Sequence, residues 1–278
     1  MSSTVRRGYA VTGSRGLRVV GDVHAPAEGT DLPVLILLNG FLLRRTWGFY
    51  PFLAERLAER GFVVATIDPG TSEEGTAPEK ATVGDLLGDL GSVVDAVVAG
   101  DLPEMDRCMR EGVGLVGHSV GGAVALLHAR KDRRIRGIVT LAGFSTLERF
   151  GAEATEQLER EGFVEVAQPT GGLARLPKTF LDDLERHRGN YCVEAAVRGL
   201  RIPVAFVHGE EDHVVGVTEG ELLYHWSDKD RSRLIVFEKT GHTFGAVHPF
   251  RGTNPDLERL LRILATFFGK HVQSASRA

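Results

Sequence analysis

Cysteine is scarce in this sequence. Only Cys108 and Cys192 occur among 278 residues, and they lie far apart. Neither belongs to a Cys-x-x-Cys pair or to a Cys/His cluster, so neither a disulfide framework nor a structural zinc site is indicated. The sequence also lacks a His-Glu-x-x-His motif. We therefore expect no metal and no cofactor.

Long apolar runs and an excess of positive charge are also missing. No run approaches the ~18 apolar residues of a membrane-spanning helix, and the first residues, MSSTVRRGYAVTG, contain no apolar segment typical of a secretory signal. The net charge is −4, without a basic stripe that would favour nucleic acid. These absences predict a soluble, cytoplasmic protein with neither membrane nor nucleic acid as partner, and they leave a homodimer open.

Short apolar runs alternate with amphipathic stretches, which is typical of strands and helices around a parallel sheet. A hairpin is expected at 8–12 and 17–24, on either side of a Gly-Ser-Arg-Gly turn. Near-continuous apolar runs predict buried strands, at 34–38, 62–67, 113–116, 135–141, 204–207 and 234–237. Helical periodicity marks 49–57, 86–97, 121–130 and 257–268.

The connection between 142 and 202 is too long for a simple crossover. It is rich in charge and carries amphipathic pieces such as Phe180, Leu181 and Leu184. Insertions of this length are usually functional lids or small subdomains. We therefore expect a cap at residues 145–200, inserted after the sixth strand, and a core domain made of residues 1–144 and 201–278.

Ser119 is the candidate nucleophile. It lies in Gly117-His118-Ser119-Val120-Gly121, a G-x-S-x-G pattern with an apolar run before it and a helical pattern after it. A serine hydroxyl is a weak nucleophile that must be exposed at a sharp strand-to-helix turn. Glycines two residues to either side remove side chains that would collide across that turn.

An acid and a base follow Ser119 in the order that this arrangement requires. Asp212 comes just after the run 204–207, and His242 comes after the run 234–237. Asp212 would orient His242, which would take the proton of Ser119. Glu210 and Glu211 are rival acids, and His213 and His248 are rival bases; His118 is interpreted as a packed residue or as one that supports the catalytic side chains from behind.

Backbone N–H groups are expected to form an oxyanion hole beside Ser119. One is that of Val120, directly after the nucleophile, and the other that of Phe41, in the loop that follows 34–38. Arg44 and Arg45 follow that loop and are candidates for binding a carboxylate or phosphate of the substrate. Phe144 and Phe244 are candidates for an apolar substrate-binding surface.

The chain resembles the α/β-hydrolase superfamily over nearly its whole length, in particular bacterial serine esterases similar to dienelactone hydrolase and prolyl oligopeptidase. Four blocks match in order: 39–41, 117–122, 208–212 and 241–244. Many relatives have His-Gly where this chain has Asn39-Gly40. The resemblance implies an α/β fold with a mostly parallel sheet flanked by helices, and cleavage of an ester, thioester or amide.

The expected activity is hydrolysis of small to medium carboxylic esters through an acyl-serine intermediate, with a small-molecule ester as substrate. An acyltransferase, thioesterase or peptidase would use the same three side chains, and these alternatives stay open. A non-catalytic ligand-binding scaffold is a further alternative. It is less favoured because proteins of that kind usually lose a member of the triad, and here all three are present.

Overall fold

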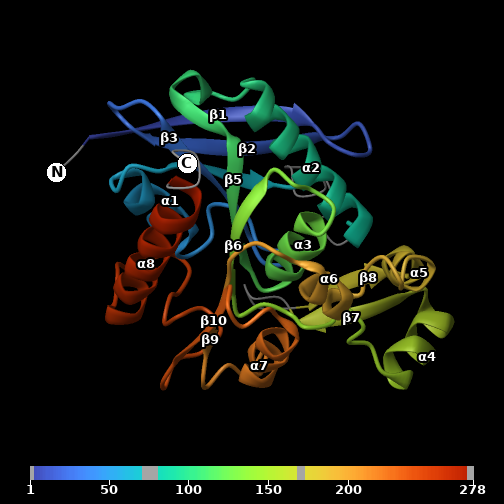
Figure 1. The fold of residues 1–278 in the computed structure, drawn as a ribbon. Helices are drawn as coiled ribbons and strands as arrows, with labels where there is room; N and C mark the ends of the chain where they lie inside the picture. Colours follow the sequence, from blue (N-terminus) through green and yellow to red (C-terminus); the bar gives the residue numbers. More distant parts are fainter. Residues whose placement is uncertain (1–2, 71–80, 168–172, 274–278) are drawn as a thin grey trace.

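The structure is a computed structural model that describes residues 3–70, 81–167 and 173–273. In this part of the chain, eight strands form the central sheet in the order β1-β2-β4-β3-β5-β6-β9-β10 (Figure 1). The strands are β1 (Thr4–Thr12), β2 (Arg18–Pro26), β3 (Leu32–Leu38), β4 (Val63–Asp68), β5 (Cys108–His118), β6 (Ile135–Leu141), β9 (Val204–Gly209) and β10 (Ser232–Phe237). The β1–β2 and β2–β4 pairs are antiparallel, and all the others are parallel.

Helices cover both faces of this sheet (Figure 1). One layer holds α1 (Tyr50–Ala58) and α8 (Pro255–Phe268). The other holds α2 (Val83–Ala99), α3 (Val120–Ala129), α6 (Val193–Gly199) and α7 (Val217–Trp226). A short 3-10 helix, η2 (Met105–Arg107), precedes β5, and a π-helical turn, η3 (Gly269–Gln273), follows α8.

The two helix layers explain why the central strand β3 is apolar along its whole length. Along β3, Val34 and Ile36 face the cluster that contains residues of α2 and α3, whereas Leu35 and Leu37 face the cluster of α1 and α8. Successive side chains of a strand point to opposite faces, so a strand covered on both sides needs apolar residues throughout.

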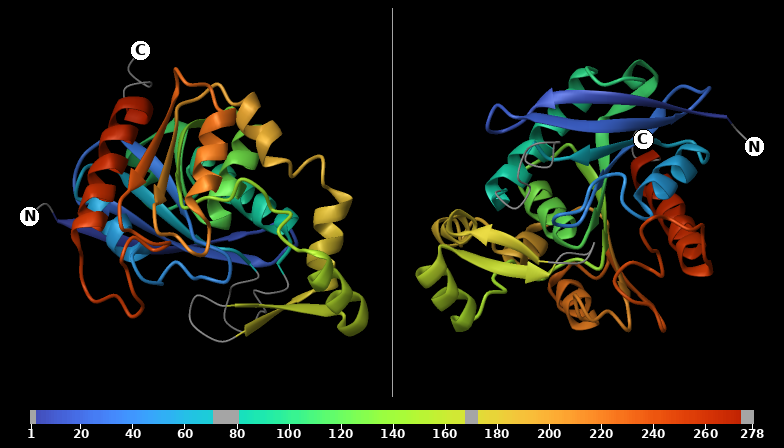
Figure 2. Two further views of the ribbon diagram at one scale, coloured as in Figure 1. Left: turned by 90° about the horizontal axis from the view of Figure 1, so that it is seen from below. Right: turned by 180° about the vertical axis from the view of Figure 1, so that it is seen from behind.

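The chain between β6 and β9 forms a separate lobe. It contains α4 (Ala152–Glu161), the antiparallel strands β7 (Phe163–Ala167) and β8 (Leu173–Pro177), and α5 (Lys178–Arg186). Both views of Figure 2 place this lobe to one side of the core. The lobe contacts the core through α5, where Asp183 Oδ2 accepts a hydrogen bond from the Gly84 N–H of α2 at 3.1 Å.

Helix α6 marks where the lobe ends. It packs against α3 and α7, and Val193, Ala196 and Val197 are buried there. The helix is therefore part of the core layer, although the expected cap boundary at residue 200 places it within the insertion.

The predicted fold class is confirmed: the sheet is mostly parallel and flanked by helices. The expected hairpin and the six apolar runs each correspond to a strand, although 17–24 and 62–67 begin one residue before β2 and β4, and the four periodic segments overlap α1, α2, α3 and α8. The sequence interpretation did not identify α7, β7 or β8. The two strands of the lobe pair only with each other, so they lack the long apolar runs of buried strands.

Candidate active site

Ser119 occupies the turn between β5 and α3. Its backbone has φ 58° and ψ −123°, a region that residues with a side chain rarely adopt. Its N–H donates to the Leu141 carbonyl at 2.8 Å, which ties the turn to β6. Such strain persists only where the surroundings impose it and is typical of functional sites. The N-terminus of α3 begins at the next residue and favours negative charge beside the serine.

The two glycines of the turn leave no room for a side chain. A Cβ at Gly117 would lie 2.3 Å from the Gly121 carbonyl oxygen. A Cβ at Gly121 would lie 2.6 Å from the Asn39 carbonyl oxygen. Both of these oxygens belong to the backbone, so they cannot rotate away as a side chain could. The spacing of the G-x-S-x-G pattern is therefore a packing requirement of the strand-turn-helix geometry.

Asp212 and His242 are brought together by the loops that follow β9 and β10. His242 Nδ1 lies 2.8 Å from Asp212 Oδ2. The other carboxylate oxygen, Oδ1, accepts hydrogen bonds from the N–H groups of Val214 at 2.9 Å and Val215 at 2.8 Å. Both oxygens of this buried carboxylate are therefore engaged, and the His242 ring is held by one of them.

Burial by itself would raise the pKa of Asp212. The hydrogen bonds from His242 and from the backbone of Val215 and Val214 outweigh that effect and lower the pKa below its usual value. The side chain is thus an anion at neutral pH. An anion at His242 Nδ1 fixes the proton on that nitrogen and leaves Nε2 as the basic one.

The rival acids and bases lie elsewhere. Glu210 and Glu211 are exposed, and Glu210 accepts from the Lys239 N–H at 3.1 Å. His213 is exposed as well. His248 is exposed, stacks on Trp47 and accepts from the Gly48 N–H at 3.1 Å.

The loop after β3 passes directly over Ser119. A Cβ at Gly40 would lie 3.3 Å from Ser119 Cβ, so this loop and the nucleophile turn are in contact. The Gly40 N–H donates to Tyr50 Oη at 2.9 Å and is therefore already used. The N–H of Phe41, one residue further, stays the candidate oxyanion donor in this loop, together with that of Val120.

Ser119 and His242 line one pocket of about 300 Å³. Its wall is mostly apolar, with Phe41, Leu42 and Leu43 from the loop after β3 and Val120 from α3. The lobe closes the other side with Leu147, Phe150, Val166, Leu176 and Phe180. The site is therefore built by the core and roofed by the insertion.

The structure places three of the candidate substrate-binding residues in three different surroundings. Phe144 lines the pocket and stays a candidate for binding substrate. The expectation for Phe244 is corrected: its ring is 0% exposed and packs on Phe49 and Phe237 in the core. Arg44 is exposed and is not among the residues that line the pocket. A loop position next to the site does not by itself aim a side chain into it.

Arg149 lines the pocket, and sequence reasoning missed it. Its guanidinium lies 4.4 Å from the centre of the Phe144 ring, and Nη1 pairs with Glu219 Oε1 at 2.8 Å. The other Glu219 oxygen accepts from Ser145 N at 2.7 Å. Arg149 lies in the insertion, far in sequence from the motifs, so only tertiary contact reveals it.

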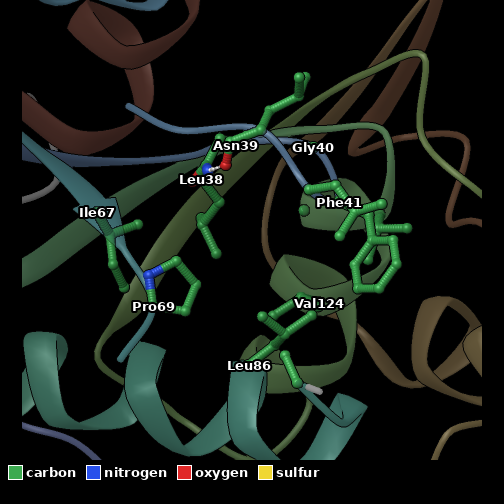
Figure 3. Close-up of a pocket in the computed structure, with 13 residues that line it drawn as sticks. Leu38, Asn39, Gly40, Phe41, Ile67, Pro69, Leu86 and Val124 are labelled. Carbon is green, nitrogen blue, oxygen red and sulfur yellow. Dashed lines mark hydrogen bonds between the residues drawn. The ribbon is translucent and has the colours of Figure 1, made fainter. Parts of the chain in front are cut away.

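A second, smaller recess of about 30 Å³ shares the loop after β3 with this pocket. Figure 3 shows Phe41 facing Ile67 and Pro69 across the recess, with Leu86 and Val124 below. Phe41 thus contributes to both spaces.

Arg45 anchors the loop that carries Phe41. Its backbone N–H and its guanidinium both donate to Asp68, which is 1% exposed, and Nε donates to Asp22 at 2.7 Å. Burial raises the pKa of Asp68 despite the hydrogen bonds and charge of Arg45. The arginine therefore compensates a deeply buried carboxyl group at the end of β4.

No group of three or more His, Cys, Asp or Glu side chains within residues 3–70, 81–167 and 173–273 is placed to hold a metal ion. No helix in these ranges has the length and apolar character needed to cross a membrane.

The sheet order, the strained serine at the β5–α3 turn and the acid and histidine after β9 and β10 define an α/β-hydrolase. A model of the alpha/beta hydrolase family matches residues 35–255, and the chain belongs to this family.

The chain is 30% identical over 131 residues to uncharacterized protein PA2218 from Pseudomonas aeruginosa. This match covers 45% of the chain and 33% of the relative, so it spans about a third of the relative's length.

Solved structures share the fold. The esterase domain of a Rhodothermus marinus protein is 18% identical, with a TM-score of 0.69 over 96% of this chain and 99% of that one. Est1E from Butyrivibrio proteoclasticus, with ferulic acid bound, is 19% identical, with a TM-score of 0.73 over 95% and 99%. Identities this low establish a common fold and no more.

Proposed function

We propose that this protein is a serine hydrolase that cleaves small to medium carboxylic esters through an acyl-serine intermediate. The observation that carries the proposal is one pocket that holds both Ser119, at a strained strand-to-helix turn, and His242, whose Nδ1 is 2.8 Å from the buried carboxylate of Asp212. A nucleophile, a base and an orienting acid are the parts that acyl transfer needs.

The chemistry follows from these positions. Ser119 Oγ attacks the ester carbon while its proton passes to His242 Nε2, and the carbonyl oxygen becomes an oxyanion beside the N–H groups of Phe41 and Val120. Collapse of this intermediate breaks the bond to the alcohol, which leaves with the proton from His242. Water then attacks the acyl-serine by the same steps, releasing the carboxylic acid and restoring the serine. Each oxyanion donor is worth about 2.7–4 kcal/mol.

The pocket favours an uncharged, apolar acyl group. Four phenylalanines face it, Phe41, Phe144, Phe150 and Phe180, and the charge of Arg149 is already paired with Glu219. An alkyl or aryl chain would bury apolar surface against these rings. The ferulic acid bound in Est1E, a protein of the same fold, is in keeping with an aryl acyl group here.

Hydrolysis of p-nitrophenyl esters from acetate to decanoate tests the proposal. We expect wild type to cleave short and medium esters, to be labelled by a fluorophosphonate, and Ser119→Ala to lose both by several orders of magnitude. Ser92→Ala is the matched control, because Ser92 Oγ donates to the Gly88 carbonyl within α2 and Ser92 is not among the residues that line the pocket.

Two results would change the assignment. Labelling without ester cleavage would keep the nucleophile and direct the search to thioesters and amides. Neither labelling nor cleavage would contradict the proposal and favour a non-catalytic scaffold.

A further inference from the structure

A chain of buried hydrogen bonds links the loop after β3 to the loop after β10 through His118, the residue before Ser119. The Gly40 N–H donates to Tyr50 Oη at 2.9 Å. Tyr50 Oη lies 2.7 Å from His118 Nδ1, and His118 Nε2 lies 3.1 Å from the His242 carbonyl oxygen. We call these two side chains, 1% and 0% exposed, the Tyr50–His118 relay.

The two ends of the relay fix the direction of every bond in it. A backbone N–H can only donate, so Tyr50 Oη accepts from Gly40 and has its own proton left for His118 Nδ1. A carbonyl oxygen can only accept, so His118 Nε2 must donate to His242. His118 is therefore the neutral tautomer with its proton on Nε2, and each polar atom named has a partner.

Charge agrees with this assignment. Burial, and after it the neighbouring His242, lower the pKa of His118 to about 3. The two rings lie 4.7 Å apart between centroids. A neutral His118 leaves the positive charge that develops on His242 during acyl transfer without a repelling neighbour.

A merely space-filling role would not need these polar atoms. Tyr50 and His118 are packed among rings, with Phe49 5.3 Å from His118 between centroids. Apolar side chains of similar size would fill that space without the cost of burying donors and acceptors. A fully satisfied buried network instead specifies one geometry.

We propose that Tyr50 and His118 are positioning residues for the acyl transfer, an inference that rests on the proposed function. The relay holds the main chain of Gly40, next to the oxyanion donor Phe41, and the main chain of His242 at a fixed separation across Ser119. Asp212 orients the ring of His242; the relay places its backbone. Neither relay side chain touches the ester.

Tyr50→Phe is the first test, because it removes one oxygen and keeps the ring. We expect kcat for p-nitrophenyl butyrate to fall about 10- to 100-fold, the cost of a small misplacement of reacting groups, with KM within about twofold. The rate of fluorophosphonate labelling should fall by a similar factor. Tyr9→Phe is the matched control: it removes a tyrosine hydroxyl that donates to the Thr66 carbonyl at 2.8 Å, on the β1–β4 side of the sheet. It should lower Tm without lowering kcat.

The double variant Tyr50→Phe/His118→Leu tests whether the two residues act as a unit. We expect its kcat to be no lower than that of the more impaired single variant, Tyr50→Phe or His118→Leu. Loss of one hydrogen bond of the relay already removes the link between Gly40 and His242, so loss of a second adds nothing. Independent losses that multiply would contradict the relay. Nitrogen NMR of the wild-type histidines should find His118 protonated on Nε2 alone, and a proton on Nδ1 would overturn the assignment even if a variant fails to fold.

The relay and the proposed function fail in different ways. A wild-type protein that neither cleaves esters nor reacts with fluorophosphonate contradicts the proposed function and removes the basis of the relay. An active wild type with an equally active Tyr50→Phe variant contradicts the relay alone.

Discussion

Phe41, next to the nucleophile turn, packs against Phe180 of α5, with ring centroids 5.5 Å apart and the planes tilted by 45°. The pair joins the loop that carries the candidate oxyanion donor to the lobe that roofs the pocket. Phe180 also contacts Phe150 within the lobe, at 6.1 Å between centroids. The pocket wall and the roof are therefore one aromatic cluster.

Phe180→Ala should enlarge the pocket and weaken binding of apolar acyl groups. We expect KM for p-nitrophenyl hexanoate to rise several-fold, while kcat for the acetate changes little, because a two-carbon acyl group has little apolar surface to bury against Phe180. Steady-state kinetics across the ester series would measure this. Phe163→Ala, in β7 but outside the pocket lining, is the control. A uniform change across all chain lengths would contradict a role for Phe180 in acyl binding.

Asp212→Asn should leave the site in place and remove most of its activity. An amide cannot hold the His242 ring with the proton on Nδ1 as the carboxylate does, and loss of the equivalent anion in a serine triad costs about 10⁴-fold in kcat. The comparison is kcat for p-nitrophenyl butyrate. Glu211→Gln, an exposed neighbour and rival acid, should be unaffected. A large loss of kcat in Glu211→Gln, together with an active Asp212→Asn, would assign the orienting acid to Glu211 in place of Asp212.

Gly121→Ala should disrupt the turn and the loop above it together. The new methyl would lie 2.6 Å from the Asn39 carbonyl oxygen and 2.9 Å from that of Leu38, so the loop with Phe41 must move. We expect a lower Tm and a kcat reduced by more than about 10²-fold, since displacements of about 1 Å have that effect. Gly199→Ala, where nothing lies within 4 Å of the added Cβ, is the matched substitution and should fold and react normally.

Arg45→Met should destabilise the fold, whereas Arg44→Met should not. The first removes the guanidinium that pairs with the buried Asp68 and keeps the backbone N–H that donates to it. Breaking a buried ion pair typically costs about 3–5 kcal/mol. Arg44 is exposed and was expected from sequence to bind substrate. Urea unfolding and ester kinetics on both variants would separate these roles. A specific loss of activity in Arg44→Met would restore the substrate-binding hypothesis for that residue.

The free energy of unfolding should decrease as the pH falls below about 6.5. Burial lowers the pKa of His118 to about 3 and that of His24 to about 4, so both are neutral when folded and take up protons more readily when unfolded. Their contribution is complete above the unfolded pKa and is lost as the pH falls toward the folded values, at up to about 1.4 kcal/mol per pH unit for each.

Urea unfolding at pH 7.5, 6.5 and 5.5 would measure this slope. His24→Gln should reduce it, and the exposed His213→Gln should leave it unchanged. A slope that is equal in all three proteins would show that the buried histidines do not set the acid sensitivity.

The sequence by itself determined the sheet, the turn at Ser119 and the order of acid and histidine. Apolar runs such as 34–38 predict strands buried on both faces, and the glycines at 117 and 121 predict a turn with no room for a side chain, because these are local constraints. Parallel strands bring their carboxyl ends to one edge, so Asp212 and His242 could be placed near Ser119 from their positions after two such runs.

Only the tertiary structure decided which side chains surround that centre. Arg149, Phe150 and Phe180 come from a lobe whose amphipathic segments do not record where it docks on the core, and Tyr50 looks like any apolar residue on the buried face of α1. Phe244 and Arg44, close to the site in sequence, turn to the core and to solvent. A side chain's direction is set by the packing of several segments distant in sequence, and no local pattern records that packing.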